Sequence, residues 1–326
     1  MTTDLSWSIF QAWNKAIENR EERGISARNR IWASELGGAY IDRYLKMTGV
    51  EPSNPFDSRA LRKFEAGNMM EWVVGLVLKR AGIFIDAQEW VEYQYPNLLS
   101  VSGKLDFLAG VKPDCEKAKT EISDLGLPAV FGSATSAIID YLRGKFPDGM
   151  KTIVLETKSC SNYMFEKYLK TGADERHKMQ AFHYLMAKDL DEAHVVYISK
   201  DDLRMLEFGV FKTPEVEAVY KKDIETMSDF YYKKIQPPKE KEIIVDDKTG
   251  NFTANFKVGY SNYLKMLYGH ENQGDFDDKF RAKVSKWNRV LKRVKEEKKM
   301  TELNTDTLNE IKAEGFDIGT PKQEAL

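Results

Sequence analysis

The sequence predicts an α/β fold, because blocks with helical periodicity and blocks with strand periodicity follow one another along the chain. The first 82 residues have helical spacing, with helices expected at Trp7–Glu22, Ile31–Met47 and Ser58–Ala81. From Ile83 onward, short runs rich in β-branched and aromatic residues replace this pattern. The order of elements is helix, three strands, helix, two strands, which is typical of a sheet covered by helices.

Five runs have the composition of strands, and turn residues separate them. They are Ile83–Tyr95, Leu98–Leu108, Thr152–Lys158, Ala193–Ser199 and Leu203–Phe211. The first two flank Pro96-Asn97 and are expected to form a hairpin. Helices are predicted at Asn162–Leu169, Asp174–Lys188 and Pro214–Lys234.

Changes in composition divide the chain into three regions. Residues 1–57 form a helical N-terminal region, residues 58–236 a core, and residues 237–326 a basic helical C-terminal region that begins at Pro237-Pro238. Within the core, residues 112–149 are polar and rich in glycine and proline, and they are expected to be an insertion around one helix at Ser136–Lys145.

Composition excludes several classes of protein. With 42% hydrophobic residues in 326, the chain can bury a core, and its net charge of -2 neither favours nor excludes a nucleic-acid partner. Cys115 and Cys160 are too few for a disulfide framework or an iron–sulfur cluster held by this chain alone. The charged N-terminus resembles neither a signal peptide nor a membrane span. The expectation is a soluble, cytoplasmic protein that does not enter a membrane.

A carboxylate and an ammonium group share one face of the strand Thr152–Lys158. Residues two apart in a strand point to the same side, so Glu156 and Lys158 project together. A carboxylate can hold a hard cation there, while the lysine can position water or stabilise charge on a phosphate. Taken alone, this E-x-K pattern is more often an ion pair without a catalytic role.

Asp106, in Gly103-Lys104-Leu105-Asp106, can supply a second carboxylate on the preceding strand. Magnesium prefers one or two carboxylates together with water and phosphate oxygens, so Asp106 and Glu156 would be sufficient protein ligands. In isolation, G-x-x-D is more often a turn that leads into a strand.

Two helices add further candidates. Glu71 is the only charged residue between Ala66 and Leu78, so it needs a compensating partner, which could be a metal site or a salt bridge. Gln180 and Tyr184 are four residues apart on one helix face, where they could hold a phosphate oxygen, and His177 lies one turn before Gln180. A Gln–Tyr pair at this spacing has no diagnostic value by itself.

Read in chain order, these motifs resemble the motif series of RecB-like PD-(D/E)XK nucleases. The series is a glutamate on a helix (Glu71), G-x-x-D ending at Asp106, E-x-K on a strand (Glu156 and Lys158), and H-x-x-Q-x-x-x-Y on a helix (His177, Gln180 and Tyr184). This branch includes phage recombination exonucleases and CRISPR-adaptation nucleases. The resemblance covers residues 34–211, and Ser34-Glu35-Leu36-Gly37 is similar to a short N-terminal motif of the branch.

The resemblance implies a restriction-endonuclease-like α/β core with a central mixed sheet flanked by helices. It implies Mg²⁺, with Mn²⁺ as a substitute, bound by Asp106 and Glu156 with Glu71 close by and a contact from the backbone carbonyl of Thr157. It also implies a catalytic Lys158. Gln180 and Tyr184 would support that site. The cluster-binding cysteines of some relatives are missing, so no iron–sulfur cluster is expected, and the 112–149 insertion separates Asp106 from Glu156 more widely than is usual.

The predicted function is hydrolysis of DNA by in-line attack of a metal-activated water, in an exonuclease of recombination, repair or phage DNA processing. Partners implied are DNA, a single-strand annealing protein or helicase, and further copies of the chain. Alternatives are an endonuclease, a non-catalytic member of the same fold that binds DNA or a protein partner, and an unrelated metal-dependent phosphatase or nucleotide hydrolase. A further alternative is a structural or assembly protein in which these ion pairs have only a structural role.

Residues 279–299 predict a basic amphipathic helix. They include ten Lys or Arg and two Glu, with an apolar stripe at Phe280, Val284, Trp287, Leu291 and Val294. The stripe would pack on the core or a partner, and the cationic face could contact phosphates. The candidate DNA contacts are His177, Lys286, Arg289, Lys292 and Arg293. A solvated surface helix without a ligand is an equally simple interpretation.

Overall fold

The computed structural model describes residues 9–18, 26–125, 135–246, 249–295 and 302–316. The chain forms two compact units. The first comprises Met1–Gly38, Arg43–Val50 and Phe56–Gln236, and the second comprises Ala39–Asp42, Glu51–Pro55 and Pro237–Leu326. None of the described helices combines the length and the apolar character that crossing a membrane requires.

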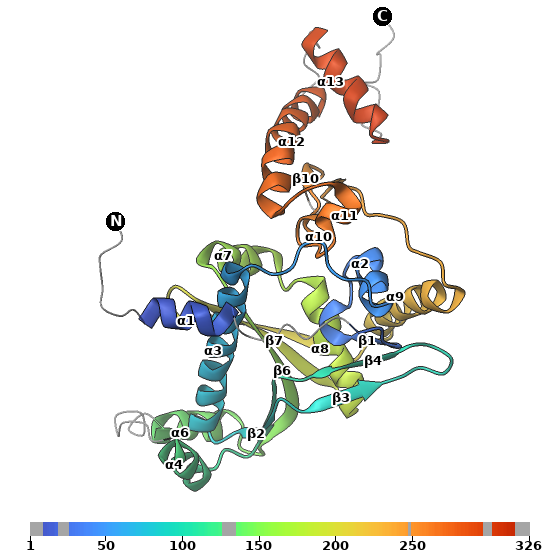
Figure 1. Ribbon diagram of the computed structural model, residues 1–326. Helices are drawn as coiled ribbons and strands as arrows, with labels where there is room; N and C mark the ends of the chain where they lie inside the picture. The colour runs from blue at the N-terminus through green and yellow to red at the C-terminus, as the bar shows by residue number, and fades with distance from the viewer. Residues whose placement is uncertain (1–8, 19–25, 126–134, 247–248, 296–301, 317–326) are drawn as a thin grey trace, which may run out of the picture. The chain divides into compact units, whose positions relative to one another are not determined.

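Helices and strands alternate over the first 236 residues (Figure 1). The helices are α1 (Ile9–Glu18), η1 (Ala33–Glu35), α2 (Tyr40–Met47), α3 (Ser58–Arg80), α4 (Cys115–Asp124), α6 (Thr135–Lys145), α7 (Asn162–Thr171), α8 (Glu175–Lys188) and α9 (Pro214–Lys233). The strands are β1 (Arg30–Trp32), β2 (Phe84–Ala87), β3 (Trp90–Tyr93), β4 (Ser100–Lys104), β5 (Phe107–Val111), β6 (Met150–Cys160), β7 (Glu192–Ser199) and β8 (Met205–Phe211).

The central sheet has the strand order β2-β5-β6-β7-β8. Strands β6 and β7 run parallel, and the other neighbouring pairs run antiparallel. A smaller sheet has the order β1-β4-β3. The predicted α/β fold with a central mixed sheet flanked by helices is therefore confirmed.

Helices α3 and α8 cover opposite faces of this sheet. Val74 and Leu78 of α3 pack in one apolar cluster with Leu155 of β6 and Val196 of β7. Helix α8 also packs on β6 and β7. Its His177 contacts Tyr197 of β7, and successive side chains of a strand point to opposite faces, so Tyr197 and Val196 lie on different faces of the sheet. Figure 1 shows α3 beside the sheet, where it runs for 23 residues.

The prediction of one helix at Ile31–Met47 is wrong over the first half of this segment. Ile31 belongs to β1, which pairs in parallel with β4, and a 3-10 turn follows before α2 begins at Tyr40. Gly37 has φ +67°, a left-handed conformation that ends helical geometry for most residues. Apolar spacing alone cannot distinguish this strand–turn–helix from one helix, because Ile31 and Leu36 are buried in both.

The two strands predicted to flank Pro96-Asn97 each divide in two. The hairpin exists between β3 and β4, with Asn97 at φ 62°, but β2 and β5 pair instead within the central sheet. The breaks fall at Gln88, whose φ is 57°, and at Leu105 and Asp106. The predicted hairpin thus contributes to both sheets, and its two breaks lie side by side, because the Gln88 N–H donates to the Asp106 carbonyl at 3.1 Å.

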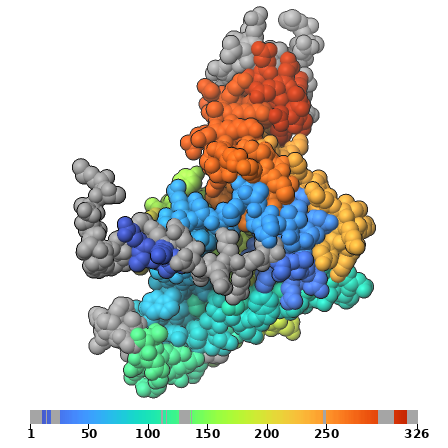
Figure 2. Space-filling model, in the orientation of Figure 1, coloured from blue at the N-terminus to red at the C-terminus, as the bar shows by residue number. Residues whose placement is uncertain are grey.

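The 112–149 insertion contains two described helices rather than the one predicted. Asp114 caps α4, its carboxylate accepting the N–H groups of Glu116 and Lys117 at 2.9 and 3.0 Å. Arg143 of α6 donates to the Pro113 carbonyl at 3.0 Å. Helix α4 packs against both α3 and α6, so the insertion lies beside the C-terminal part of α3 (Figures 1 and 2).

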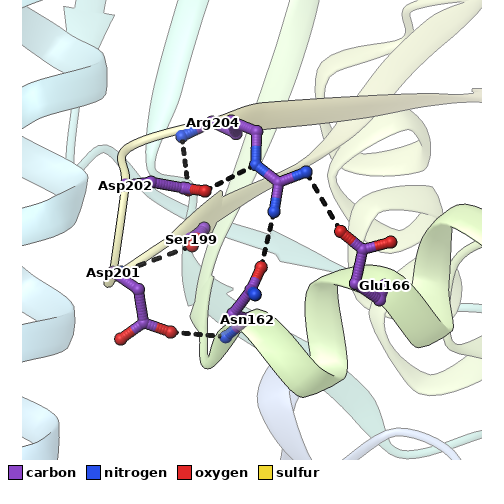
Figure 3. A network of polar contacts seen from close by, with 6 residues as sticks. All are labelled: Asn162, Glu166, Ser199, Asp201, Asp202 and Arg204. Atoms are coloured by element: carbon purple, nitrogen blue, oxygen red, sulfur yellow. Dashed lines mark hydrogen bonds and ion pairs between the residues drawn. The ribbon is translucent and has the colours of Figure 1, made fainter.

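A polar network joins the β7–β8 turn to the start of α7 (Figure 3). The Arg204 guanidinium donates to Asp202, Glu166 and Asn162, and the Asp201 carboxylate accepts the Asn162 N–H at 2.7 Å. Since α7 begins two residues after β6 ends, these contacts fix the path of the chain as it leaves β6.

The second unit has its own core. Its elements are β9 (Ile243–Val245), β10 (Phe252–Ala254), α10 (Phe256–Gly259), α11 (Leu264–Tyr268), α12 (Gln273–Lys295) and α13 (Glu302–Ala313). Phe280, Trp287 and Leu291, three members of the predicted apolar stripe, are buried together with Ile311 of α13. The stripe therefore packs inside this unit; the side chain of Val294 lies outside the described residues.

Candidate active site

Strand β6 carries a buried carboxylate and a lysine on one face, as the alternation of the sequence predicts. The Glu156 side chain is 0% exposed, and the Lys158 side chain is 26% exposed. The Lys158 ammonium donates to Oε1 of Glu156. Among the described residues, Oε2 of Glu156 has no hydrogen-bond partner. One oxygen of a completely buried carboxylate is thus left without the partner that burial normally demands.

Asp106 lies directly beside Glu156. Phe107 at the start of β5 pairs with Leu155 of the antiparallel neighbour β6, and this register brings the preceding Asp106 next to Glu156. Oδ2 of Asp106 accepts the backbone N–H of Thr157 at 2.7 Å. The hydrogen bond orients the Asp106 carboxylate toward β6 in spite of the long insertion between the two strands.

Glu71 reaches the same region because α3 approaches β5 closely. At Gly75, one turn further along α3, an added Cβ would lie 2.8 Å from the ring of Phe107, so a larger residue would push the helix away. Glu71 accepts a hydrogen bond from Nε2 of Gln88 at 2.5 Å. Helix α3 and the β2–β3 junction together hold this carboxylate.

The pKa values of all three carboxyl groups are raised, mainly by burial. Burial and the charge of Asp106 raise the pKa of Glu71 to about 7 and that of Glu156 to about 8. Burial also raises the pKa of Asp106, although Lys158 and the Thr157 N–H oppose this. For Lys158, burial lowers the pKa, but the carboxylates of Glu156 and Asp106 outweigh it and the net shift is upward. Near neutral pH, bound protons therefore offset part of the negative charge of Glu71 and Glu156.

These residues fit a divalent cation. Asp106 and Glu156 offer hard oxygen ligands, and within the described part of the chain one oxygen of Glu156 is buried without a partner. Within the described ranges, no three His, Cys, Asp or Glu side chains converge as one metal-binding group. Two protein carboxylates completed by water and substrate oxygens are a ligand set that magnesium accepts.

Gln180 and Tyr184 connect α8 to the strand that precedes Asp106. Nε2 of Gln180 donates to the Tyr184 hydroxyl at 3.0 Å, and that hydroxyl donates to the Lys104 carbonyl at 2.7 Å. An added Cβ at Gly103 would lie 3.2 Å from the same hydroxyl and 2.8 Å from Cβ of Ala33. The glycine of G-x-x-D thus gives α8 room to approach, and the Gln–Tyr pair supports the backbone before Asp106.

His177 lies near the cluster but is uncharged. Its Nδ1 is 2.8 Å from the Tyr197 hydroxyl. Burial and the positive charges of Lys158 and Arg176 lower its pKa to about 3, so it is neutral at physiological pH. A contact of His177 with DNA would therefore be a hydrogen bond and not a salt bridge. His183 faces elsewhere, against the Tyr220 hydroxyl at 2.9 Å.

No family model matches the sequence, and neither does any curated protein. Among solved structures, this chain is similar to an alkaline exonuclease from Laribacter hongkongensis, at 9% identity and a TM-score of 0.37 over 69% of this chain and 94% of that chain. For a complex of that exonuclease with dAMP, the identity is 11% and the TM-score 0.40, with the same coverage. A phage-related exonuclease from Haemophilus somnus 129PT is similar at 13% identity, with a TM-score of 0.28 over 64% of this chain and 96% of that chain.

Proteins named as exonucleases are thus among the structures similar to this chain. At these identities, no role of an individual residue is transferred from them.

Gln88 is a residue of the site that its sequence context did not reveal. Its side chain holds Glu71, its backbone N–H holds the Asp106 carbonyl, and its φ of 57° is strained for a residue other than glycine. The only sequence signal was a polar Asp-Ala-Gln-Glu interruption, positions 86 to 89, within an otherwise strand-like run.

The predicted basic contacts on α12 belong to the second unit. Lys286 pairs with Glu310 at 3.0 Å, and Lys286, Arg289 and Lys292 are all exposed. The side chain of Arg293 lies outside the described residues. That these exposed side chains bind phosphates remains a proposal.

The raised carboxyl pKa values predict how pH changes stability. A carboxyl group with a higher pKa in the folded chain keeps a proton that the unfolded chain has lost, so stability falls as pH rises toward the folded pKa. For Glu71 and Glu156 this fall extends from about pH 4.5 to about 7 and 8. His177 and His183, with pKa lowered to about 3, act oppositely, but only below about pH 6.5. We expect the Tm of the metal-free protein to fall between pH 6.5 and pH 8.

Thermal unfolding with EDTA, Mg²⁺ or Mn²⁺ checks this expectation. Metal ligands must be deprotonated, so the metal should raise Tm more at pH 8 than at pH 6.5. Burial lowers the pKa of His194, but Glu207 and Glu192 outweigh it and the net shift is upward. His194 therefore also makes stability fall as pH rises, and this contribution should be the same with and without metal. A metal effect that is absent, or the same at both pH values, would argue against a cation at the carboxylates.

Proposed function

We propose that this chain is a divalent-metal-dependent nuclease that hydrolyses phosphodiester bonds in DNA, acting as an exonuclease. The observation that supports it is the cluster of Asp106, Glu156 and Lys158. There a buried carboxylate keeps one oxygen without a partner among the residues that the structure describes, beside a second carboxylate and an ammonium. The order of motifs along the chain supports the same activity.

In this proposal Asp106, Glu156 and the Thr157 carbonyl hold Mg²⁺, which Mn²⁺ can replace. When bound, the cation lowers the pKa of a water molecule and offsets negative charge on the phosphate. Lys158 stays protonated, because its pKa is raised, and therefore acts as a donor to a phosphate oxygen or to the attacking water rather than as a base. Glu71, with a pKa of about 7, is suited to accept a proton through water.

Other features of the site position these groups. Gln180 and Tyr184 fix the backbone before Asp106, and Gln88 holds Glu71. Exposed Arg289 and Lys292 would add affinity for phosphates. A role in recombination, repair or phage DNA processing, a single-strand annealing or helicase partner, and assembly of several copies are further parts of the proposal that follow from the resemblance.

The test is an assay on end-labelled linear and closed circular DNA, single- and double-stranded, in Mg²⁺, Mn²⁺ or EDTA. We expect metal-dependent loss of linear DNA and intact circles. Cutting of circles would establish an endonuclease instead. DNA binding without cutting under any condition would identify a non-catalytic DNA-binding protein, and activity on small phosphate esters alone would identify a phosphatase.

Replacing Gln88 by alanine tests its positioning role. The Gln88 hydrogen bond lowers the pKa of Glu71, so its loss should raise that pKa, and the pH at which cutting is half-maximal should move upward. The concentration of Mg²⁺ needed should rise as well, by about tenfold, as for partners that orient metal sites. The matched control is Gln94→Ala, which removes an exposed amide that donates to the Leu98 carbonyl in the hairpin. An unchanged pH profile in Gln88→Ala would show that Gln88 has no part in the site.

A further inference from the structure

A cavity of about 460 Å³ opens beside Glu71, between α3, β2 and the end of α4. Its walls are mainly apolar, and Trp72, Leu76, Phe84 and Phe107 provide most of them. This volume is within the range of pockets that bind small molecules. Helix α3 faces the cavity with residues spaced three and four apart from Asn68 to Lys79, so one helix borders both this cavity and the carboxylate cluster.

Two features of the wall fit a nucleotide. The Trp72 side chain is 54% exposed although it borders the cavity, which leaves an aromatic surface available to a planar ligand. Polar groups complete the lining: the carboxamides of Asn68 and Gln88, and the ammonium of Lys79, which lies 4.7 Å from the centre of the Phe84 ring. Amides match the edges of bases, and an ammonium matches a phosphate.

Glu71 and Gln88 link the cavity to the proposed chemistry, since both border it. The Gln88 side chain donates to the Glu71 carboxylate at 2.5 Å, and its backbone N–H donates to the Asp106 carbonyl at 3.1 Å. A base attached to a phosphate at the cluster would therefore have this cavity as a neighbour. We propose that the cavity binds one unpaired base of the DNA strand next to the bond that is cut, with the base stacked on Trp72. This inference rests on the proposed nuclease function and adds a substrate class, a strand whose nucleotide at the site is not base-paired.

The experiment uses end-labelled single-stranded oligonucleotides in Mg²⁺, with one abasic nucleotide moved along the strand. In the wild type we expect one position, at or next to the cut, where the abasic nucleotide lowers kcat/KM by about tenfold, as expected for losing one stacked base. Trp72→Ala should have a kcat/KM about tenfold below that of the wild type on natural DNA. In this variant the abasic nucleotide should not lower kcat/KM any further. Trp72→Phe should recover most of the loss.

The matched control is Trp90→Ala, which removes another half-exposed tryptophan, on β3, that does not border the cavity. It should show the wild-type abasic profile. Leu76→Trp, which fills the cavity, should behave like Trp72→Ala, and thermal unfolding confirms that each variant is folded.

If the abasic nucleotide lowers kcat/KM of Trp72→Ala as much as that of the wild type, the cavity does not bind a base. The same holds if the wild type cuts equally well whatever the position of the abasic nucleotide. Neither result would contradict the nuclease function. A wild type that cuts no DNA in Mg²⁺ or Mn²⁺ would overturn both.

Discussion

Replacing Lys158 by methionine is expected to slow DNA hydrolysis by about a hundred- to a thousandfold, the usual cost of removing one group that stabilises charge in the transition state. Lys158 is the ammonium that contacts Glu156 and influences both Asp106 and Glu71. Methionine keeps most of the length of the side chain without its charge. DNA affinity, measured by anisotropy in EDTA, should change little, because the loss lies in the chemical step.

The fold should survive this change. Lys158 lowers the pKa of Glu156, so without it that pKa rises above about 8, and Glu156 is neutral at pH 7 rather than a buried unpaired charge. The matched control is Lys151→Met, an exposed lysine on the same strand, which should retain wild-type cutting. If Lys158→Met cut as fast as Lys151→Met, the assignment of the catalytic lysine would fail.

Arg43→Ala is expected to reduce the free energy of unfolding by about 3–5 kcal/mol, the cost of breaking a buried ion pair from one side. The Arg43 guanidinium donates to both oxygens of Asp223 of α9, at 2.7 and 2.8 Å, and these side chains are 2% and 9% exposed. After the substitution, the Asp223 carboxylate would keep, among the hydrogen bonds of the described residues, a weak contact with the Gly37 N–H at 3.5 Å.

Urea denaturation of three variants measures this effect. Arg30→Ala, which removes an exposed pair with Glu92 at 3.8 Å, should cost only about 0–1 kcal/mol. The double variant Arg43→Met with Asp223→Leu should recover much of the loss, because it leaves neither charge buried alone. A loss below about 1 kcal/mol for Arg43→Ala would show that the pair does little to hold α2 and α9 in place.

Local sequence pattern was sufficient to predict the parts of the site that lie on a single helix or strand. Alternation along β6 predicted that Glu156 and Lys158 share a face, and the apolar surroundings of Glu71 predicted a charge that needs a partner. The same surroundings suggest a largely buried helix, which is wrong, because α3 is buried only at Val74, Gly75 and Leu78. These inferences need only the geometry of one strand or one helix.

Contacts between distant segments could not be predicted in this way. Gln88 meets Glu71 only because the predicted strand breaks there and changes sheets, and such breaks depend on pairing partners elsewhere in the chain. The steric roles of Gly75 against Phe107 and of Gly103 against Tyr184 likewise exist only once helices have packed on the sheet. The same limit explains why the β1 segment at Ile31 was predicted as helix.

The most direct test compares wild type with Glu156→Gln on end-labelled linear DNA in Mg²⁺ and in EDTA. Glutamine keeps the shape of the buried side chain but removes the charge that would hold the cation. We predict that the wild type cuts DNA in Mg²⁺ but not in EDTA, and that Glu156→Gln does not cut in either condition. Cutting by the wild type in EDTA, or by Glu156→Gln at the wild-type rate, would contradict it.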